Sequence, residues 1–229
     1  MKKHLMKHKV LYIILGVIVI LIIGAVIAVT SPKNLGVGYT KADLNSAITK
    51  VGTTYASTSQ GDSLKIVGSK KLDTKLTQSE LTALLNQPSD LWKDYPIKNV
   101  QLKINDDGSV EMTGKIITGR YNDYVKATNV PDKYTSLVKD KVNLVPLNPS
   151  FDYKGNYEIQ NGKVVGELTE LKVGPVAIPK TWTDNNKDFI AGFVEDRLNS
   201  AGLDVQNAKF TNGNLDIQGS APQTISFEK

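Results

Sequence analysis

The chain has 229 residues, two histidines and no cysteine. Both histidines, His4 and His8, precede an uncharged apolar run over residues 10–29, so neither residue type occurs after that run. Zinc sites built on imidazole or thiolate, Ser-His-Asp triads and Cys-His pairs are therefore excluded from residues 31–229.

The distribution of charge argues against a nucleic-acid partner. Four of the 28 basic side chains are lysines ahead of the apolar run, which leaves 24 basic and 23 acidic side chains in residues 31–229. The basic character of the chain is therefore a property of its N-terminus. Only two of those 24 side chains are arginines, whose planar forks usually bind a phosphate backbone. We expect no nucleic-acid partner.

The apolar run predicts a transmembrane signal anchor. A helix of its 20 residues would be about 30 Å long, which matches the hydrocarbon core of a bilayer. The preceding lysines favour a cytoplasmic N-terminus and hence a single-pass protein whose C-terminal domain lies outside the cell membrane. A signal peptide cleaved after Ala28 is the competing interpretation, although its apolar part would normally be about 7–15 residues. The predicted organisation is a cytoplasmic segment (1–9), the anchor (10–30), a linker (31–39) and an extracytoplasmic domain (40–229).

Two capping boxes predict the first helices of this domain. Thr40 and Asp43 open a helix that Gly52 ends, and the Ser-, Thr- and Gly-rich residues 53–61 predict a loop after it.

The second capping box follows residues 63–76, which predict one strand. Thr77 and Glu80 open a helix over Ser79–Gln87 with a stripe of leucines on one face. Pro88 is expected to end it, because proline cannot donate the next helical hydrogen bond.

Alternating apolar and polar residues around turn sequences predict three β-hairpins. Their turns are Asp106-Asp107-Gly108, Asn161-Gly162 and Asn212-Gly213. In the first and third hairpins the strand and turn residues follow one another at the same intervals along the chain. Each of these hairpins follows an amphipathic helix, Ser79–Gln87 or Asp184–Leu198. We interpret this as an α-plus-β repeat, although turn chemistry alone makes unrelated hairpins look alike.

These segments resemble known membrane-anchored proteins. The YpmS-like group of Firmicute proteins is similar at Leu81–Asn86, Val100–Ile104 and Asp107–Glu111. The LmeA-like lipid-binding proteins, of the TULIP-like class, are similar at Asn161–Lys163, Val173–Pro179 and Asn212–Leu215. The resemblance implies a curved antiparallel sheet that wraps a long helix, with an apolar groove between them and no catalytic residues. We therefore predict an α+β fold in which an N-terminal transmembrane helix precedes a curved antiparallel sheet of β-hairpins packed on amphipathic helices.

No motif predicts catalysis. Residues 136–139 match the S-x-x-K nucleophile motif, but its S-D-N and K-T-G partners are missing, so a solvated helix over 132–142 is the simpler interpretation. Asp106 and Asp107 lack the spacing of a calcium loop, because Lys103 takes a ligand position, and we expect them to form turn hydrogen bonds. We predict no enzyme, no cofactor and no metal; a hydrolase that uses carboxylates alone is a third alternative.

Aromatic side chains supply the candidate ligand site. Phe189 and Phe193 recur at helical spacing, and Gly192 would let a bound chain approach the helix closely; core packing is the plainer explanation of this stripe. Other aromatic residues occupy proline-bounded segments, where rings either cap a core or meet lipid headgroups. The predicted ligand-binding residues are Trp92, Tyr95, Trp182, Phe189, Gly192 and Phe193.

Two functions follow as expectations. The first is a membrane-anchored extracytoplasmic binding protein that holds a lipid or other apolar ligand between helix and sheet. The second is a cell-envelope accessory or scaffold protein that contacts an envelope protein partner. The lack of cysteine in an exported domain is typical of a Gram-positive bacterium.

Overall fold

The computed structural model describes residues 30–57, 63–128, 130–135 and 148–228. No helix within these ranges is long and apolar enough to cross a bilayer. The predicted anchor lies outside them except for Thr30, and so does the S-x-x-K motif at 136–139.

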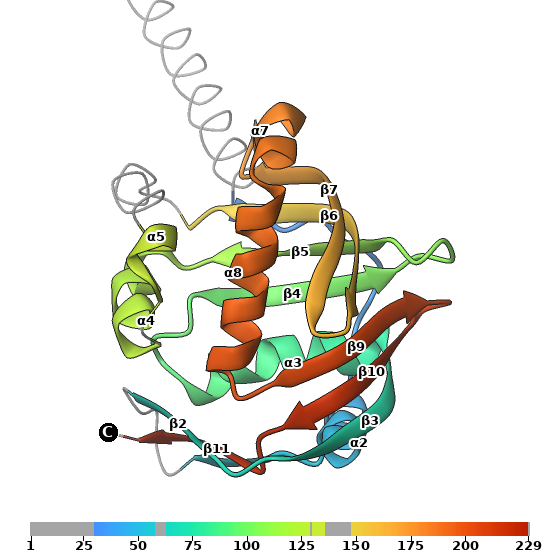
Figure 1. Cartoon of the computed structure of the whole chain (residues 1–229). Helices are drawn as coiled ribbons and strands as arrows, with labels where there is room; N and C mark the ends of the chain where they lie inside the picture. The colour runs from blue at the N-terminus through green and yellow to red at the C-terminus, as the bar shows by residue number, and fades with distance from the viewer. Residues whose placement is uncertain (1–29, 58–62, 129, 136–147, 229) are drawn as a thin grey trace, which may run out of the picture.

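The fold is α+β, with a mostly antiparallel sheet and several helices (Figure 1). In chain order the elements are α2 (Lys41–Val51), β1 (Thr54–Ser57), β2 (Ser63–Val67), β3 (Lys70–Thr77), α3 (Gln78–Leu91), β4 (Ile97–Ile104), β5 (Val110–Ile116), the 3-10 turn η1 (Thr118–Arg120), α4 (Tyr121–Ala127), α5 (Asp132–Thr135), β6 (Ser150–Gln160), β7 (Lys163–Val173), β8 (Val176–Ala177), α7 (Lys180–Asn185), α8 (Lys187–Ser200), β9 (Asp204–Thr211), β10 (Asn214–Ala221) and β11 (Thr224–Glu228).

The long strand β6 joins two wings of the main sheet. Its first half pairs with β5, and its last residues, Ile159 and Gln160, pair with β9 on the same side. One wing is therefore β5–β4 and the other is β9–β10–β3, while β7 and then β8 extend the sheet on the opposite side of β6. A small second sheet has the order β1–β11–β2 and brings the C-terminal strand beside β1.

The outer edge of β4 is covered by helix α3 instead of another strand. Gln78, Thr82 and Asn86 are four residues apart, so their side chains lie on one face of the helix. They bond alternate backbone groups of β4: Gln78 Oε1 accepts from Ile104 N (3.1 Å), Thr82 Oγ1 from Leu102 N (3.1 Å), Asn86 Oδ1 from Val100 N (2.9 Å), and Asn86 Nδ2 donates to Val100 O (2.8 Å). These side chains satisfy the polar groups that an open strand edge would leave unpaired.

Two apolar clusters fill the space between α3 and the wings. The first is built on β4 and β5 and the second on β9 and β10, and both contact Leu81 of α3 and Phe210 of β9. Their buried members are Leu102, Ile104 and Val110 in the first cluster, and Val205, Ala208 and Leu215 in the second. Helix α3 thus connects the two wings through its apolar face, whereas its polar face bonds β4 alone.

The local signals in the sequence are confirmed. Helix α2 has the capping box of Thr40 and Asp43 and ends at Gly52, whose φ is 67°. All three hairpins form at their predicted turns. Asn161 and Asn212, each followed by glycine, have φ values of 50° and 47°. Two-residue hairpin turns need such positive φ values to match the right-handed twist of the strands they join.

Four predicted boundaries are wrong because longer-range contacts override them. Helix α3 continues past Pro88, whose carbonyl accepts from Trp92 N (2.9 Å). Residues 63–76 form two strands in different sheets, since the chain turns at Gly68 (φ 71°). The helix expected over 184–198 is divided at Asn186 into α7 and α8. The loop expected over 53–61 includes β1, which pairs with β11.

The segment predicted as a linker, 31–39, lies against the domain. Leu35 N donates to Gln101 Oε1 (2.8 Å), and the side chain of Val37 is buried. These contacts fix where the chain reaches the domain from its N-terminal side.

The two helix–hairpin units read as a repeat are both present, but their helices pack differently. Helices α3 and α8 each have 14 residues and each precedes a hairpin. Helix α3 lies along an edge strand through three polar side chains. Helix α8 makes one such bond, from Val164 N of β7 to Glu195 Oε1 (3.0 Å), near its C-terminal half. Helix α8 is therefore bonded to the backbone of β7 at Glu195.

We expect Asn86→Leu to lower the free energy of unfolding by about 3 kcal/mol, because it leaves the buried N–H and C=O of Val100 unpaired. Thermal unfolding of the full chain, followed by circular dichroism, measures this. Asn45→Ala on the exposed surface of α2 is the matched control and should change stability little. Equal effects of the two substitutions would contradict a structural role for the α3–β4 bonds.

Candidate functional site

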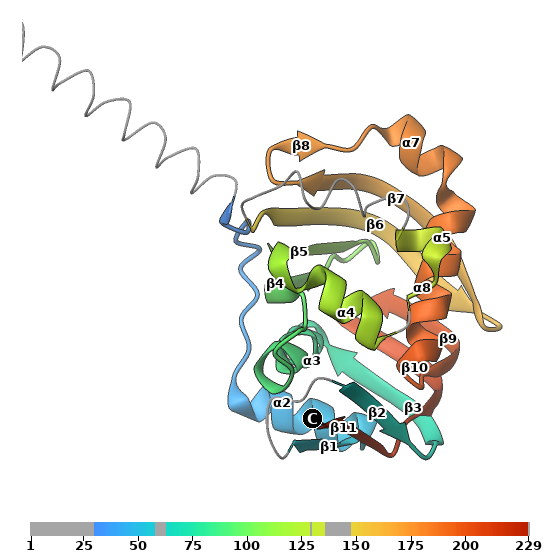
Figure 2. The same ribbon diagram turned by 90° about the vertical axis from the view of Figure 1, so that its left-hand side faces the viewer.

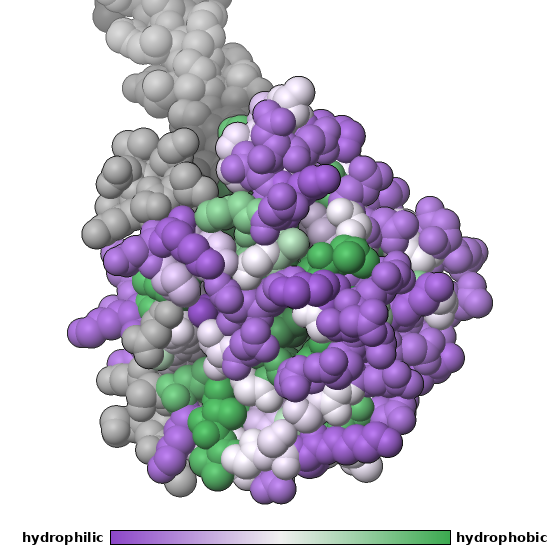
Figure 3. Space-filling view, viewed as in Figure 1, coloured by the Kyte–Doolittle hydropathy of each residue, from purple (hydrophilic) through white to green (hydrophobic). Residues whose placement is uncertain are grey.

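An apolar pocket of about 610 Å³ lies between helices α4, α5, α7 and α8 and the end of β7. It lacks charged side chains among the described residues that line it: Tyr121, Tyr124, Val125, Val130, Tyr134, Leu171, Val173, Ile178, Pro179, Trp182, Phe189 and Phe193. We call it the aromatic pocket. In Figure 3, pale green and white surface lies between the positions of α5 and α8, and deeper green patches lie elsewhere on the same face.

Regular spacing within each element directs these side chains to one place. Tyr121, Tyr124 and Val125 stand three and four residues apart and so share one face of α4. Phe189 and Phe193 do the same on α8. Figure 2 shows α4 and α5 beside α8 and below the β7–β8 end of the sheet.

Tyr134 of the one-turn helix α5 is the central ring of the pocket wall. It is buried, and its ring meets those of Phe189 and Phe193 edge to face, with centroids 4.9 and 5.0 Å apart. Its hydroxyl donates to Asp196 Oδ2 (2.7 Å), one turn further along α8. Lys133 Nζ lies 3.1 Å from the same carboxylate oxygen and 4.5 Å from the Tyr134 ring centre. These contacts hold α5 against α8.

The hydrogen bond from Tyr134, followed by that from Lys133, lowers the pKa of Asp196. Both bonds favour the charged carboxylate, and they outweigh its small loss of hydration. The contribution of a carboxyl group with a lowered pKa to stability is present above its unfolded-state pKa and is lost as the pH falls through its folded-state value.

Three of the six predicted site residues line the aromatic pocket. Trp182 and Phe193 stand at its mouth with 42% and 38% of their surface exposed, and Phe189 lies deeper. Gly192 lies beside the pocket without lining it: a Cβ there would be 3.4 Å from the hydroxyl of Tyr134. The close approach that Gly192 was expected to permit is therefore made by Tyr134 of the chain itself.

Trp92 and Tyr95 lie behind the pocket. They form an aromatic triad with Tyr124, whose ring centre is 5.4 Å from that of Trp92 and 6.1 Å from that of Tyr95. Trp92 is only 2% exposed, and burial raises the pKa of Tyr95. Tyr124 belongs to both groups, so the triad supports the pocket wall from behind instead of contacting its contents.

Sequence reasoning missed the tyrosines of the pocket. The three- and four-residue spacing of Tyr121, Tyr124 and Val125 was an available signal for an apolar helix face. Tyr134 stood in a segment read as a solvated helix, of which only Asp132–Thr135 is within the described residues. Its partners on α8 are more than 50 positions away, and no local pattern connects them.

The aromatic stripe on α8 is not core packing of the ordinary kind. No residue of α8 is fully buried, although Leu198 contacts the second apolar cluster. Phe189 and Phe193 face the aromatic pocket, where part of their surface has no neighbour among the described residues. The C-terminal half of the helix thus attaches it to the sheet, and the N-terminal half lines the cavity.

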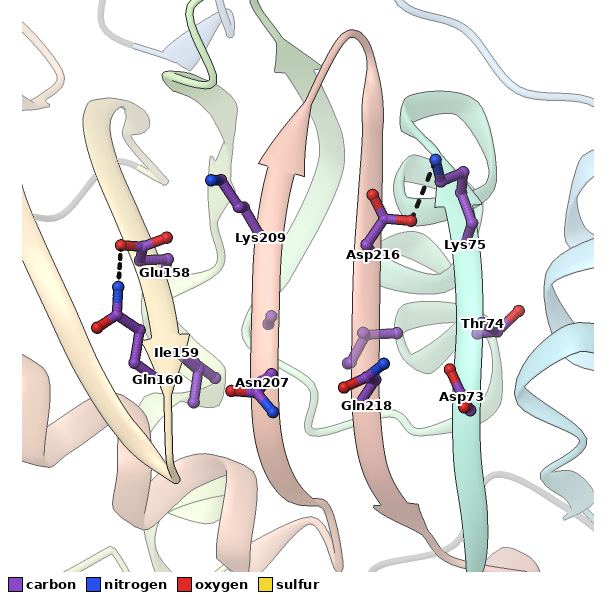
Figure 4. Close-up of a pocket in the computed structure, with 12 residues that line it drawn as sticks. Asp73, Thr74, Lys75, Glu158, Ile159, Gln160, Asn207, Lys209, Asp216 and Gln218 are labelled. Atoms are coloured by element: carbon purple, nitrogen blue, oxygen red, sulfur yellow. Dashed lines mark hydrogen bonds and ion pairs between the residues drawn. The ribbon is translucent and has the colours of Figure 1, made fainter.

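A second hollow, of about 590 Å³, lies on the outer face of β6, β9, β10 and β3, and we call it the polar trough (Figure 4). Its side chains are mostly polar, and several already bond one another: Lys75 Nζ lies 3.2 Å from Asp216 Oδ1, and Gln160 bonds Glu158. It has no aromatic ring among its described lining residues. Interspersed charges of both signs are typical of a solvated sheet face.

Asp107 forms the turn hydrogen bonds that the sequence predicted for it. Asp107 Oδ1 accepts from the backbone N–H (2.9 Å) and the hydroxyl (2.6 Å) of Ser109, and these bonds lower the pKa of Asp107. Across the described ranges, no group of three or more His, Cys, Asp or Glu side chains is placed to hold a metal ion.

The chain matches no family model, no curated protein and no solved structure.

We expect Phe193→Ala to cost only about 1–2 kcal/mol of folding free energy, because part of the ring faces the cavity and loses few packing contacts. The matched control is Phe210→Ala, which removes a ring shared by both apolar clusters and should cost about 3–5 kcal/mol. Thermal unfolding of the full chain compares them. A loss of 3–5 kcal/mol at both positions would make the α8 stripe ordinary core.

We expect Tyr134→Phe to raise the pKa of Asp196 towards the ordinary Asp value of 3.8, because the phenylalanine ring cannot donate to the carboxylate. NMR titration of the side-chain carboxyl measures this. The stability difference from the unmodified chain should be present above about pH 4 and should shrink as the pH falls through the lowered pKa. Tyr121→Phe should leave the Asp196 titration unchanged; an identical shift in both variants would contradict the assignment.

Proposed function

We propose that the protein is a membrane-anchored extracytoplasmic binding protein that holds a lipid or other apolar ligand in the aromatic pocket, without catalysis. The observation that carries the proposal is the pocket itself: about 610 Å³ of space with aromatic and aliphatic walls contributed by four helices and a strand. Small-molecule sites are typically about 300–1,000 Å³ and mostly apolar, with a few polar groups that fix orientation.

The chemistry of the walls favours an acyl or similarly apolar ligand. Each buried methylene contributes about 0.8 kcal/mol through removal of apolar surface from water. The side-chain polar groups on the described lining are the tyrosine hydroxyls and the Trp182 indole, and the Tyr134 hydroxyl is already bonded to Asp196. A charged ligand would therefore find no ionic partner within the pocket.

The apolar run at residues 10–29 supports an anchor in the cell membrane, with the N-terminus in the cytoplasm and the domain outside. The resemblance to YpmS-like and LmeA-like proteins supports the same location and the same ligand class. A Gram-positive envelope is the setting that these features favour.

A second candidate function is that of an envelope accessory protein. The observation behind it is the polar trough, whose amide and charged side chains could form hydrogen bonds with a protein partner but offer little apolar surface to a lipid. Apolar-ligand binding is the better supported of the two, since three charged side chains of the trough, Asp73, Lys75 and Asp216, already form ion pairs within the chain.

A photoreactive fatty acid tests the proposed function. The full chain, held in nanodiscs, should form adducts on residues 121–134 and 171–193, and Val125→Trp should reduce them about tenfold because the added ring occupies the pocket. Val194→Trp, at an exposed valine that does not line the pocket, is the matched control and should leave the adducts unchanged. An adduct yield that Val125→Trp leaves unchanged, or adducts that map to β9 and β10, would refute the site.

A further inference from the structure

The β7–β8 hairpin ends in an exposed apolar tip, the residues Val173–Pro179. None of these seven side chains is charged or polar. Pro175, Val176 and Ala177 are exposed, and Val176, at 59%, is the most exposed large apolar side chain in the described part of the chain. Contiguous exposed apolar surface in a folded domain marks an interaction site.

The tip is held in one conformation by backbone hydrogen bonds. Gly174, with a φ of 57°, turns the chain and donates its N–H to Ser150 O (2.7 Å). Val173 and Val176 are paired across the turn, and Ile178 N donates to Leu171 O (2.8 Å). The apolar surface is thus a fixed feature, and little further ordering would be needed to bury it.

The tip is poorly suited to pairing with a second copy of the chain through its strand edge. Strand β8 has two residues, and Pro175 and Pro179 on either side of it have no N–H to donate. Short strands flanked by proline are a known means of blocking edge-to-edge pairing. The surface must therefore be covered by something that needs no backbone hydrogen bonds.

The tip lies beside the point where the chain reaches the domain from its N-terminal side. Lys33 and Lys172 border one hollow of about 180 Å³, and Lys172 is the pairing partner of Ala177. Figure 2 shows β8 and the first described residues at the same end of the molecule. The apolar run over residues 10–29 stops just before Thr30, so an anchor there would bring this end of the domain to the bilayer surface.

We propose that the apolar tip inserts into the interface of the lipid bilayer and that the aromatic pocket receives its ligand directly from the membrane. This inference rests on the proposed function, both for the anchor and for the pocket. It adds the membrane as the docking partner of one defined surface and identifies the ligand as an acyl lipid of the bilayer.

The tip and the pocket share residues, which gives the lipid a continuous apolar path. Ile178, Pro179 and Trp182 belong to the pocket wall, whereas Val176 points outside it. Trp182 stands at the mouth with its ring partly exposed, a position that suits an interfacial tryptophan.

The absence of cysteine from the chain allows a clean test. A polarity-sensitive fluorophore is attached to Ala177→Cys at the tip and, as the matched control, to Val67→Cys on the exposed surface of β2, at the opposite end (Figure 2). The full chain is held in nanodiscs of phosphatidylcholine and phosphatidylglycerol. Aqueous iodide should quench the label at 177 roughly threefold less than the label at 67, because interfacial groups sit within the headgroup layer. Lipids with a spin label on the acyl chain should quench only the label at 177.

Equal iodide quenching at both positions would overturn the inference, because it would show a tethered domain that does not dock. Protection at 177 without quenching by the spin-labelled lipids, together with a dimeric mass, would also overturn it in favour of a second copy of the chain.

Val176→Asp separates this inference from the proposed function. Added to Ala177→Cys, it should restore iodide quenching at 177, since a carboxylate at the tip opposes insertion. Fatty-acid adducts in detergent solution should persist, because Val176 does not line the pocket. Docking without any adducts would refute the pocket and leave the docking surface intact, whereas adducts without docking would do the reverse.

Discussion

The fold depends on one set of contacts, the hydrogen bonds from Gln78, Thr82 and Asn86 to the edge of β4. A sheet that divides into two wings at β6 has an extra edge to protect, and an open edge pairs readily with other chains. Helix α3 solves this with side chains four residues apart, a distance of about 6 Å along the helix. Alternate residues of β4 repeat at about 6.6 Å, so the two periods match over three bonds. The apolar face of the same helix then joins the two clusters of the core.

The candidate site arises where the second long helix does not repeat this arrangement. Helix α8 also runs near a strand edge, that of β7, but it bonds the backbone of that strand only at Glu195 and packs Leu198 against the core. Its N-terminal half is separated from the sheet, and Tyr134 and the rings of α4 enclose the space. The α3–β4 contacts, by contrast, leave no such space along the edge of β4 in the described part of the chain. The two helix–hairpin units therefore differ in packing: α3 is bonded along its strand edge, whereas α8 leaves the aromatic pocket beside its N-terminal half.

The parts of this fold that the sequence predicted are those decided within a few residues. Capping at Thr40 and Thr77 and the Asn-Gly turns each depend on local geometry, so they could be read directly. The parts it did not predict depend on partners far along the chain: Pro88 stays in a helix that β4 holds in place, and Gly68 divides a strand between two sheets. Only part of the candidate site could be predicted, for the same reason. Phe189 and Phe193 show their helical spacing, whereas Tyr134 becomes part of the pocket through contacts with Phe189, Phe193 and Asp196 of α8, far along the chain.

Hydrogen–deuterium exchange on the full chain in nanodiscs, with and without added fatty acid, tests the central claim that a rigid α3–β core carries a separate apolar binding site. We expect ligand to slow exchange in α4, α5, α7 and the N-terminal half of α8, because these elements enclose the pocket. Exchange in α3 and β4 should already be slow and should not change, because their hydrogen bonds are complete without ligand. Protection confined to β9 and β10, or no change anywhere at saturating fatty acid, would contradict the account.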